Sequence, residues 1–341
     1  MRLPNPGIVR TAGLLGGSVL LVSLFIGLGP ARILSLLASL GWNFAVLVAL
    51  FSAHEFVRSL AITRWLPADR RLPAAEVLRI RLLGEAAGAL TRSGALAAEP
   101  TRAWLLANRS GQAVTGYSAA AGELLANTAT GAAVNIAVAG SVLWRAALSG
   151  PVVVLAHVLL WGSLVYLSVV VSIVLSRVRL LVAGVSWAAR LPVVGARLRL
   201  DPARAREMGQ AIGALMERPA ELARIVLLEL SAQTLLVCEV FWAIRSMGVS
   251  VSAGSALLFE VMPRAFTVVE IAGATEMGFA IVFAWLGLPA TIGFTLSLVK
   301  TLRSLTVGAV AIGLWKGAAF ASRVLVATPR MRDAVPVQEA E

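Results

Sequence analysis

The sequence has few of the side chains on which enzymes most often rely. Among its 341 residues there are two histidines, His54 and His157, and a single cysteine, Cys238. One cysteine excludes an internal disulfide, and no His/Cys group has metal-site spacing. The glycine-rich loop that holds ATP phosphates is also missing. We therefore expect no enzymatic activity, no bound metal and no cofactor.

Charged residues are scarce as well. They make up 14% of the chain, whereas 58% is hydrophobic, and the mean hydropathy is +0.84. These values indicate an all-α, polytopic transmembrane helix bundle in the cell (inner) membrane. The formal charge is +12, with Lys only at 300 and 316, but the basic residues lie between apolar segments. We interpret them as topology signals and contacts for anionic lipids, and not as a nucleic-acid site.

Apolar runs long enough to cross a bilayer define most of the bundle. Arginine-rich connections place the amino terminus and the segment 177–218 in the cytoplasm, where Asp201 and Pro202 predict the start of an interfacial helix. We expect seven to eight spans, with the higher number if one of two apolar stretches interrupted by glycines and charges, described next, crosses the membrane completely. One domain, 1–325, would comprise halves 1–176 and 219–325, followed by a disordered tail, 326–341. The predicted helices are 11–28, 40–62, 111–143, 152–175, 219–247 and 289–316.

Two apolar stretches, 84–100 and 263–278, are interrupted by glycines and charges. The first contains the glycines Gly84, Gly88 and Gly94 together with Glu85, Arg92 and Glu99. A charged side chain at bilayer depth costs about 3 kcal/mol, so we expect these stretches to carry the function. Their pattern predicts re-entrant hairpins or broken helices.

The two stretches also suggest an internal repeat. When Glu99 is aligned with Glu276, a long apolar helix follows each, and Glu123 falls opposite Lys300. Paired interrupted segments are typical of transporters with the substrate site where broken helices meet. We predict a long-range pairing of Glu123 with Lys300 and Arg303.

Residues 9–320 resemble the transmembrane region of lysylphosphatidylglycerol synthases and its stand-alone, flippase-like relatives. The resemblance rests on RIRLLGEAAGALTRSGALAAEPTRAWLLANRSG and on MPRAFTVVEIAGATEMG. The family's Glu-Pro loop matches Glu99 and Pro100, and its Gly-x-x-Glu matches Gly273 and Glu276. One departure is Glu123, which is followed by Leu instead of Arg. The resemblance implies binding or movement of a lipid headgroup, without the synthases' cytosolic aminoacyl-transferase domain.

Eight residues form the predicted lipid-binding site. Arg92 and Arg264 would meet phosphate, although each could instead be an interfacial anchor. Glu99 and Glu276 would meet a cationic group, or cap half-helices and pair with Arg102 and Arg264. The predicted set is Arg92, Glu99, Arg102, Glu123, Arg264, Glu276, Lys300 and Arg303.

Other polar residues within the helices have structural interpretations. Glu55 and Arg58, near His54, are expected to form an ion pair one turn apart. Glu229 and Gln233 are expected to make interhelical hydrogen bonds.

Three functions remain open from the sequence. The favoured one is an integral membrane lipid translocase for an anionic phospholipid or an isoprenoid- or hopanoid-type lipid. The alternatives are a non-transporting subunit that docks a membrane or cytosolic enzyme through 177–218, and a proton-coupled small-solute transporter. Membrane lipids are the expected partners in the first case.

Overall fold

We describe the protein from a computed structural model, which covers residues 6–91, 94–144, 150–176, 217–266 and 273–314, with a few positions between 183 and 214. Within these residues the chain is helical and contains no strand, so the predicted all-α class is confirmed. The predicted interfacial helix after Asp201, most of the segment 177–218 and the tail lie outside the described residues.

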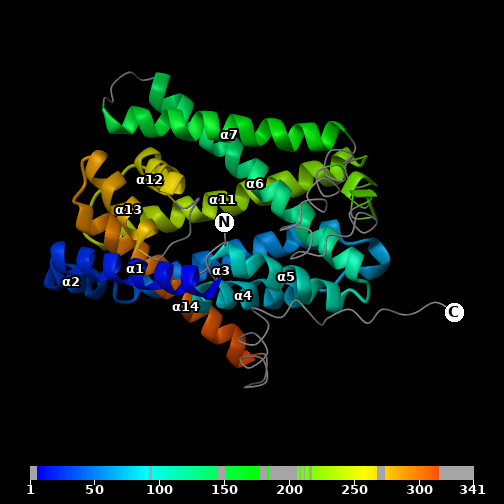
Figure 1. Ribbon diagram of the computed structural model, residues 1–341, viewed down its shortest axis with the longest axis horizontal. Coiled ribbons are helices and arrows are strands. Elements are labelled where there is room, and N and C mark those ends of the chain that lie inside the picture. The colour runs from blue at the N-terminus through cyan, green and yellow to red at the C-terminus, as the bar shows by residue number, and fades with distance from the viewer. Residues whose placement is uncertain are drawn as a thin grey trace.

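Long helices run roughly along the longest axis of the molecule, and α2, α12 and α13 gather toward one end of it (Figure 1). The α-helices and the 3-10 helix η2 are α1 (Pro6–Gly27), α2 (Pro30–Leu40), α3 (Asn43–Trp65), α4 (Ala74–Thr91), α5 (Ala95–Arg109), α6 (Ala113–Trp144), α7 (Pro151–Leu175), α11 (Pro219–Ser246), α12 (Ala253–Val261), η2 (Met262–Phe266), α13 (Ala274–Trp285) and α14 (Ala290–Leu314).

Five of these helices, α3, α6, α7, α11 and α14, are long and apolar enough to cross a membrane. A sixth span results if α1 and α2, bent by 89° at Gly29 and Pro30, are counted together. The protein is therefore a multi-pass membrane protein. Within the described residues the total of five or six is below the predicted seven to eight, because the interrupted segments there fold into shorter or more polar helices.

The outward face of α7 shows how the bundle meets its surroundings. Most of its exposed residues are apolar, with His157, Tyr166, Ser168 and Ser172 as the polar exceptions. The large apolar ones recur at helical spacing, as expected of a surface against lipid. They include Val154, Val158, Trp161, Val165 and Val169, each more than half exposed.

The first interrupted segment is a hairpin of α4 and α5. It turns at Gly94, which has φ +46° and donates its N–H to the Gly88 carbonyl at 3.3 Å. A Cβ on Gly88 would lie 2.6 Å from the Gly94 carbonyl oxygen, so glycine is needed for the close approach. At the open end, Arg109 and Glu76 pair at 3.4 Å. The hairpin therefore begins and ends on the same side, as a re-entrant segment does.

The second interrupted segment contains α12, η2 and α13. Gly273, with φ +85°, precedes α13, and its N–H donates to the Glu276 carboxylate at 2.9 Å. Gly278 lets Phe266 of η2 pack closely, because a Cβ there would lie 2.5 Å from the Phe266 Cβ. Both interrupted segments are thus broken helices, as predicted.

The two halves run in opposite directions. Trp242, near the end of α11, donates to Asn43 at the start of α3 at 3.2 Å. At the other end, Arg64 of α3 contacts Glu221 of α11 at 3.4 Å. These contacts make α3 and α11 antiparallel, so the hairpins that follow them enter from opposite ends of the bundle.

A constant spacing of 177 residues relates the halves. It separates Glu99 from Glu276 and also relates α3 to α11, α4 to α12 and η2, α5 to α13, and α6 to α14. Gly131 of α6 and Gly308 of α14 have the same spacing. Cβ atoms added to them would lie 3.8 Å from Arg264 and 3.0 Å from Ala86, respectively. Each long helix therefore packs against the other half's hairpin, which is an inverted-topology repeat.

Candidate functional site: two buried charge clusters

Arg81 of α4 lies at the centre of the first cluster. Its side chain is completely buried, and it donates from Nε to Glu55 and from Nη1 to Glu123, each at 2.8 Å. A buried guanidinium is tolerated only when carboxylates compensate its charge. The two partners lie on α3 and α6, so Arg81 connects the hairpin to two spans.

Arg58 of α3 extends this network toward α11. It donates to Glu123, and its Nε lies 3.6 Å from the Glu229 carboxylate. With its amide nitrogen toward Glu229, Asn127 donates to Glu229 and accepts from Arg58, both at 3.2 Å. The Oε1 atom of Glu229 has no hydrogen-bond partner in the part of the chain that the structure describes.

Arg102 of α5 connects the α4–α5 hairpin to the rest of the first cluster. It donates to Glu99 on its own helix and to Glu85 on α4, and lies 4.0 Å from Glu55. Arg102 is 3% exposed, whereas Glu85 and Glu99 are 25% and 19% exposed. The first cluster therefore extends from the fully buried Arg81 to a partly open edge. Its members are His54, Glu55, Arg58, Arg81, Glu85, Glu99, Arg102, Glu123, Asn127 and Glu229.

The second cluster lies between α12 and η2 on one side and α11 and α14 on the other. Glu260 accepts from both Lys300 and Arg264, the latter at 3.1 Å, and Arg264 also donates to Gln233 at 2.8 Å. Deeper in the bundle, Arg303 of α14 donates to Glu239 of α11. The second cluster comprises Gln233, Glu239, Glu260, Arg264, Lys300 and Arg303.

Aromatic rings support the cations of the second cluster and connect it to the first. The Arg303 guanidinium lies 3.7 Å from the ring centre of Phe51, a favourable cation–π distance. Phe51 stacks on His54 of the first cluster, with ring centres 5.7 Å apart. The Lys300 ammonium lies 5.4 Å from the Phe279 ring centre.

The structure places the predicted site residues in two clusters instead of one cavity. Arg102, Glu99 and Glu123 belong to the first, and Arg264, Lys300 and Arg303 to the second. Glu276 caps α13, and Glu99 pairs with Arg102, which are the structural roles considered from sequence. Arg92 lies outside the described residues.

The predicted pairing of Glu123 with Lys300 and Arg303 is wrong. Glu123 binds Arg58 and Arg81, whereas Lys300 and Arg303 bind Glu260 and Glu239. Positions related by the inverted repeat lie in different clusters, and so equivalence in the sequence does not bring them into contact.

Predictions for the other polar residues had mixed outcomes. Glu55 and Arg58 pair with partners on other helices, Arg81 and Glu123, and not as the expected local pair. The predicted interhelical hydrogen bond of Gln233 is confirmed, since it accepts from Arg264 at 2.8 Å. Glu229 instead forms an interhelical ion pair with Arg58 at 3.6 Å.

Sequence reasoning missed the roles of Arg81 and Glu260. Arg81 is the fully buried centre of one cluster, and Glu260 holds two cations of the other. In both cases a signal was present, because Arg81 and Glu85, like Glu260 and Arg264, stand four residues apart in an apolar stretch.

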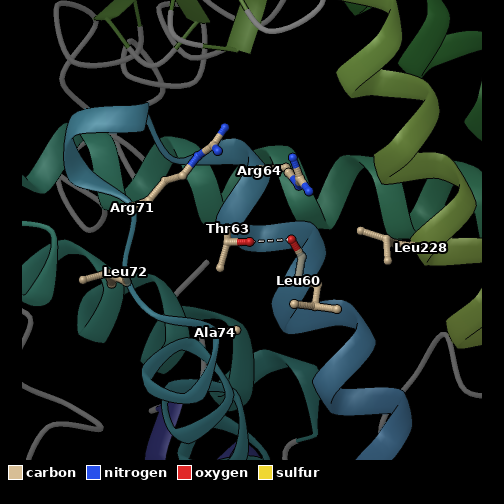
Figure 2. A pocket seen from close by; sticks show the side chains of 7 residues that line it. All are labelled: Leu60, Thr63, Arg64, Arg71, Leu72, Ala74 and Leu228. Atoms are coloured by element: carbon tan, nitrogen blue, oxygen red, sulfur yellow. Dashed lines mark hydrogen bonds between the residues drawn. The ribbon is translucent and has the colours of Figure 1, made fainter.

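A separate cavity of about 290 Å³ lies near the end of α3. Figure 2 shows its lining, which includes Arg64 of α3 and Arg71. The lining residues are Leu60, Thr63, Arg64, Arg71, Leu72, Ala74 and Leu228.

Among the described residues, no group of three or more His, Cys, Asp or Glu side chains is arranged to hold a metal ion. Comparisons with protein-family models, curated proteins and solved structures find no match to this chain.

Proposed function

We propose that this protein is a lipid translocase of the cell membrane that binds the phosphate-bearing headgroup of an anionic lipid, with its amino terminus in the cytoplasm. The proposal includes kinship with the flippase-like transmembrane region of lysylphosphatidylglycerol synthases. The observation that carries it is the placement of Arg264 and Lys300, two partly exposed cations deep in an apolar bundle.

The depth of these cations supports a role in binding. Lys300 is the eleventh residue of the 25-residue α14, about 15 Å from the helix start, and its side chain is 18% exposed. Arg264, on the broken segment, is 22% exposed. Ionisable side chains at this depth are costly and are typically found on substrate pathways.

Glu260 supplies a way to open the site. It bridges Lys300 and Arg264, so it occupies the place where a phosphate would bind both cations. A phosphate offers Arg264 two parallel acceptors, as a carboxylate does. In the proposed mechanism the headgroup replaces Glu260, the acyl chains stay in the bilayer, and the opposed hairpins expose the site to each leaflet in turn.

Leaflet exchange of a fluorescent phosphatidylglycerol in reconstituted vesicles tests this proposal. Arg264→Gln and Lys300→Gln should each slow exchange about tenfold or more, because each removes a charge-assisted hydrogen bond of roughly 1.5–3 kcal/mol. Arg224→Gln is the matched control, since Arg224 is exposed and pairs with Glu221 at 2.9 Å near the start of α11. Wild-type exchange by the folded Arg264/Lys300 double variant would remove the second cluster from the pathway.

A second candidate function, proton-coupled transport of a small solute, is favoured by Glu229. This carboxylate is fully buried, its nearest cation is 3.6 Å away, and Oε1 has no hydrogen-bond partner among the described residues. Arg58 lies between Glu123 and Glu229 and could exchange partners when a proton binds. Carboxylates within membrane helices are rare and mark ion pathways and proton relays.

The second candidate function predicts that one substitution, Glu229→Gln, abolishes proton flux. Glu229→Gln keeps the side-chain shape but removes the exchangeable proton, so pH-gradient-driven proton flux into vesicles should be abolished. Glu221→Gln, on the same helix near its start, should leave the flux unchanged. Flux that persists in Glu229→Gln rules out this proton site, and lipid exchange without proton flux favours the translocase.

A further inference from the structure

The cavity near the end of α3 lies apart from both charge clusters. It is formed by Leu60, Thr63 and Arg64 of α3, by Arg71, Leu72 and Ala74 before and at the start of α4, and by Leu228 of α11. Arg64 is six residues beyond Arg58, or about 9 Å along the helix. We infer that this cavity binds the phosphate group of an anionic phospholipid from the adjacent leaflet, as a lipid site distinct from the translocation site.

The charge of the cavity favours an anion. Arg64 and Arg71 both line it, and Figure 2 shows the two side chains among its lining residues. Arg64 is 37% exposed and has one partner, Glu221 at 3.4 Å, within the described residues. Arg71 is exposed and forms no ion pair with another described residue. Two such guanidinium groups can bind phosphate oxygens by paired hydrogen bonds.

The remaining lining favours a lipid over a free phosphate ion. Leu60, Leu72 and Leu228 provide apolar contacts that an inorganic ion cannot use, whereas a glycerol backbone and the first acyl methylenes can. The Thr63 hydroxyl proton is already donated to the Leu60 carbonyl at 2.7 Å. The hydrogen bonds to a bound phosphate would therefore come from the two arginines. Basic pockets between membrane helices commonly bind anionic lipid headgroups.

A lipid in this cavity would connect the two halves of the repeat. The lining joins α3 to α11, the first pair of helices related by the repeat, at the end where Arg64 contacts Glu221. Occupancy should therefore stabilise the packing of the halves. This inference does not depend on whether the protein transports lipid.

Lipid-dependent thermal unfolding of the full-length protein in detergent tests the inference. Phosphatidylglycerol should raise the midpoint in a saturable manner, whereas phosphatidylcholine and inorganic phosphate at equal concentration should not. Each of Arg64→Gln and Arg71→Gln should weaken the lipid's apparent affinity about fivefold, given roughly 1 kcal/mol for each cation near a membrane surface. Arg71→Gln is the cleaner variant, because Arg64→Gln also removes the contact with Glu221.

Arg109→Gln is the matched control. Arg109 is half exposed, pairs with Glu76 at the open end of the α4–α5 hairpin and does not line the cavity. Its replacement should leave the lipid response unchanged. If Arg109→Gln weakened the apparent affinity for phosphatidylglycerol as much as Arg71→Gln does, the effect would come from overall charge. If inorganic phosphate raised the midpoint as much as phosphatidylglycerol does, the cavity would be a site for free anions. Either result, or an equal response to phosphatidylcholine, overturns the inference.

Discussion

Arg81→Met should destabilise the protein by about 3–5 kcal/mol, the range expected when one partner of a buried ion pair is removed. Methionine fits an apolar interior, but the substitution would leave Glu55 and Glu123 without their 2.8 Å partner on α4. Arg58 and Arg102 would remain, and neither replaces the hydrogen bonds that Arg81 donates to α3 and α6. The thermal unfolding midpoint and the yield of monodisperse protein in detergent measure this effect.

Arg79→Met provides a closely matched control. Arg79 lies two residues before Arg81 on α4 but is exposed, so its replacement should change stability by less than about 0.5 kcal/mol. A second variant separates charge from packing. Combining Arg81→Met with Glu55→Gln and Glu123→Gln should recover part of the loss, because no uncompensated carboxylate then remains at this centre. Equal stability of Arg81→Met and Arg79→Met would contradict a central role for Arg81.

The helices were predictable because lipid imposes a simple rule on sequence. Apolar runs predicted α3, α6, α7, α11 and α14 to within a few residues, since a span must be long and continuously apolar. The interrupted segments were also predictable, because Gly88, Gly94 and Gly273 allow chain reversals and close contacts that other residues prevent. The short helix α2 was not predicted, although Gly29 and Pro30 signal the bend before it.

The partners of the buried charges were not predictable in the same way. Which carboxylate meets Arg58 or Arg303 depends on the rotation of each helix and on which helices are neighbours, and neither is set by hydropathy. Arg79 and Arg81 stand two residues apart, and hydropathy does not distinguish them, yet the helix directs Arg81 inward and Arg79 outward. The alignment of Glu99 with Glu276 gave the spacing that relates the helices of the two halves, but the equivalent positions Glu123 and Lys300 are not in contact.

Two equivalent glycines provide the sharpest test of the repeat. A Cβ on Gly116 of α6 would lie 2.2 Å from the backbone nitrogen of Ala107 on α5. A Cβ on Gly293 of α14, 177 residues later, would lie 2.4 Å from the Phe279 carbonyl oxygen on α13. Both obstacles are backbone atoms of the hairpin arm that precedes the long helix. They cannot rotate away as a side chain would, so the helices themselves must separate.

Gly116→Ala and Gly293→Ala should therefore each destabilise the protein, by about 1–3 kcal/mol or more, as overpacking does. Gly140→Ala in α6 and Gly313→Ala in α14 are the controls, because no atom lies within 4 Å of a Cβ at either position. Alanine is the better helix former by about 1 kcal/mol, so the controls should be neutral or stabilising. Thermal unfolding midpoints of the four variants would separate these outcomes. If only one of Gly116→Ala and Gly293→Ala were harmful, the two halves would not share this helix–hairpin contact, and the opposed hairpins could not move as equivalent units.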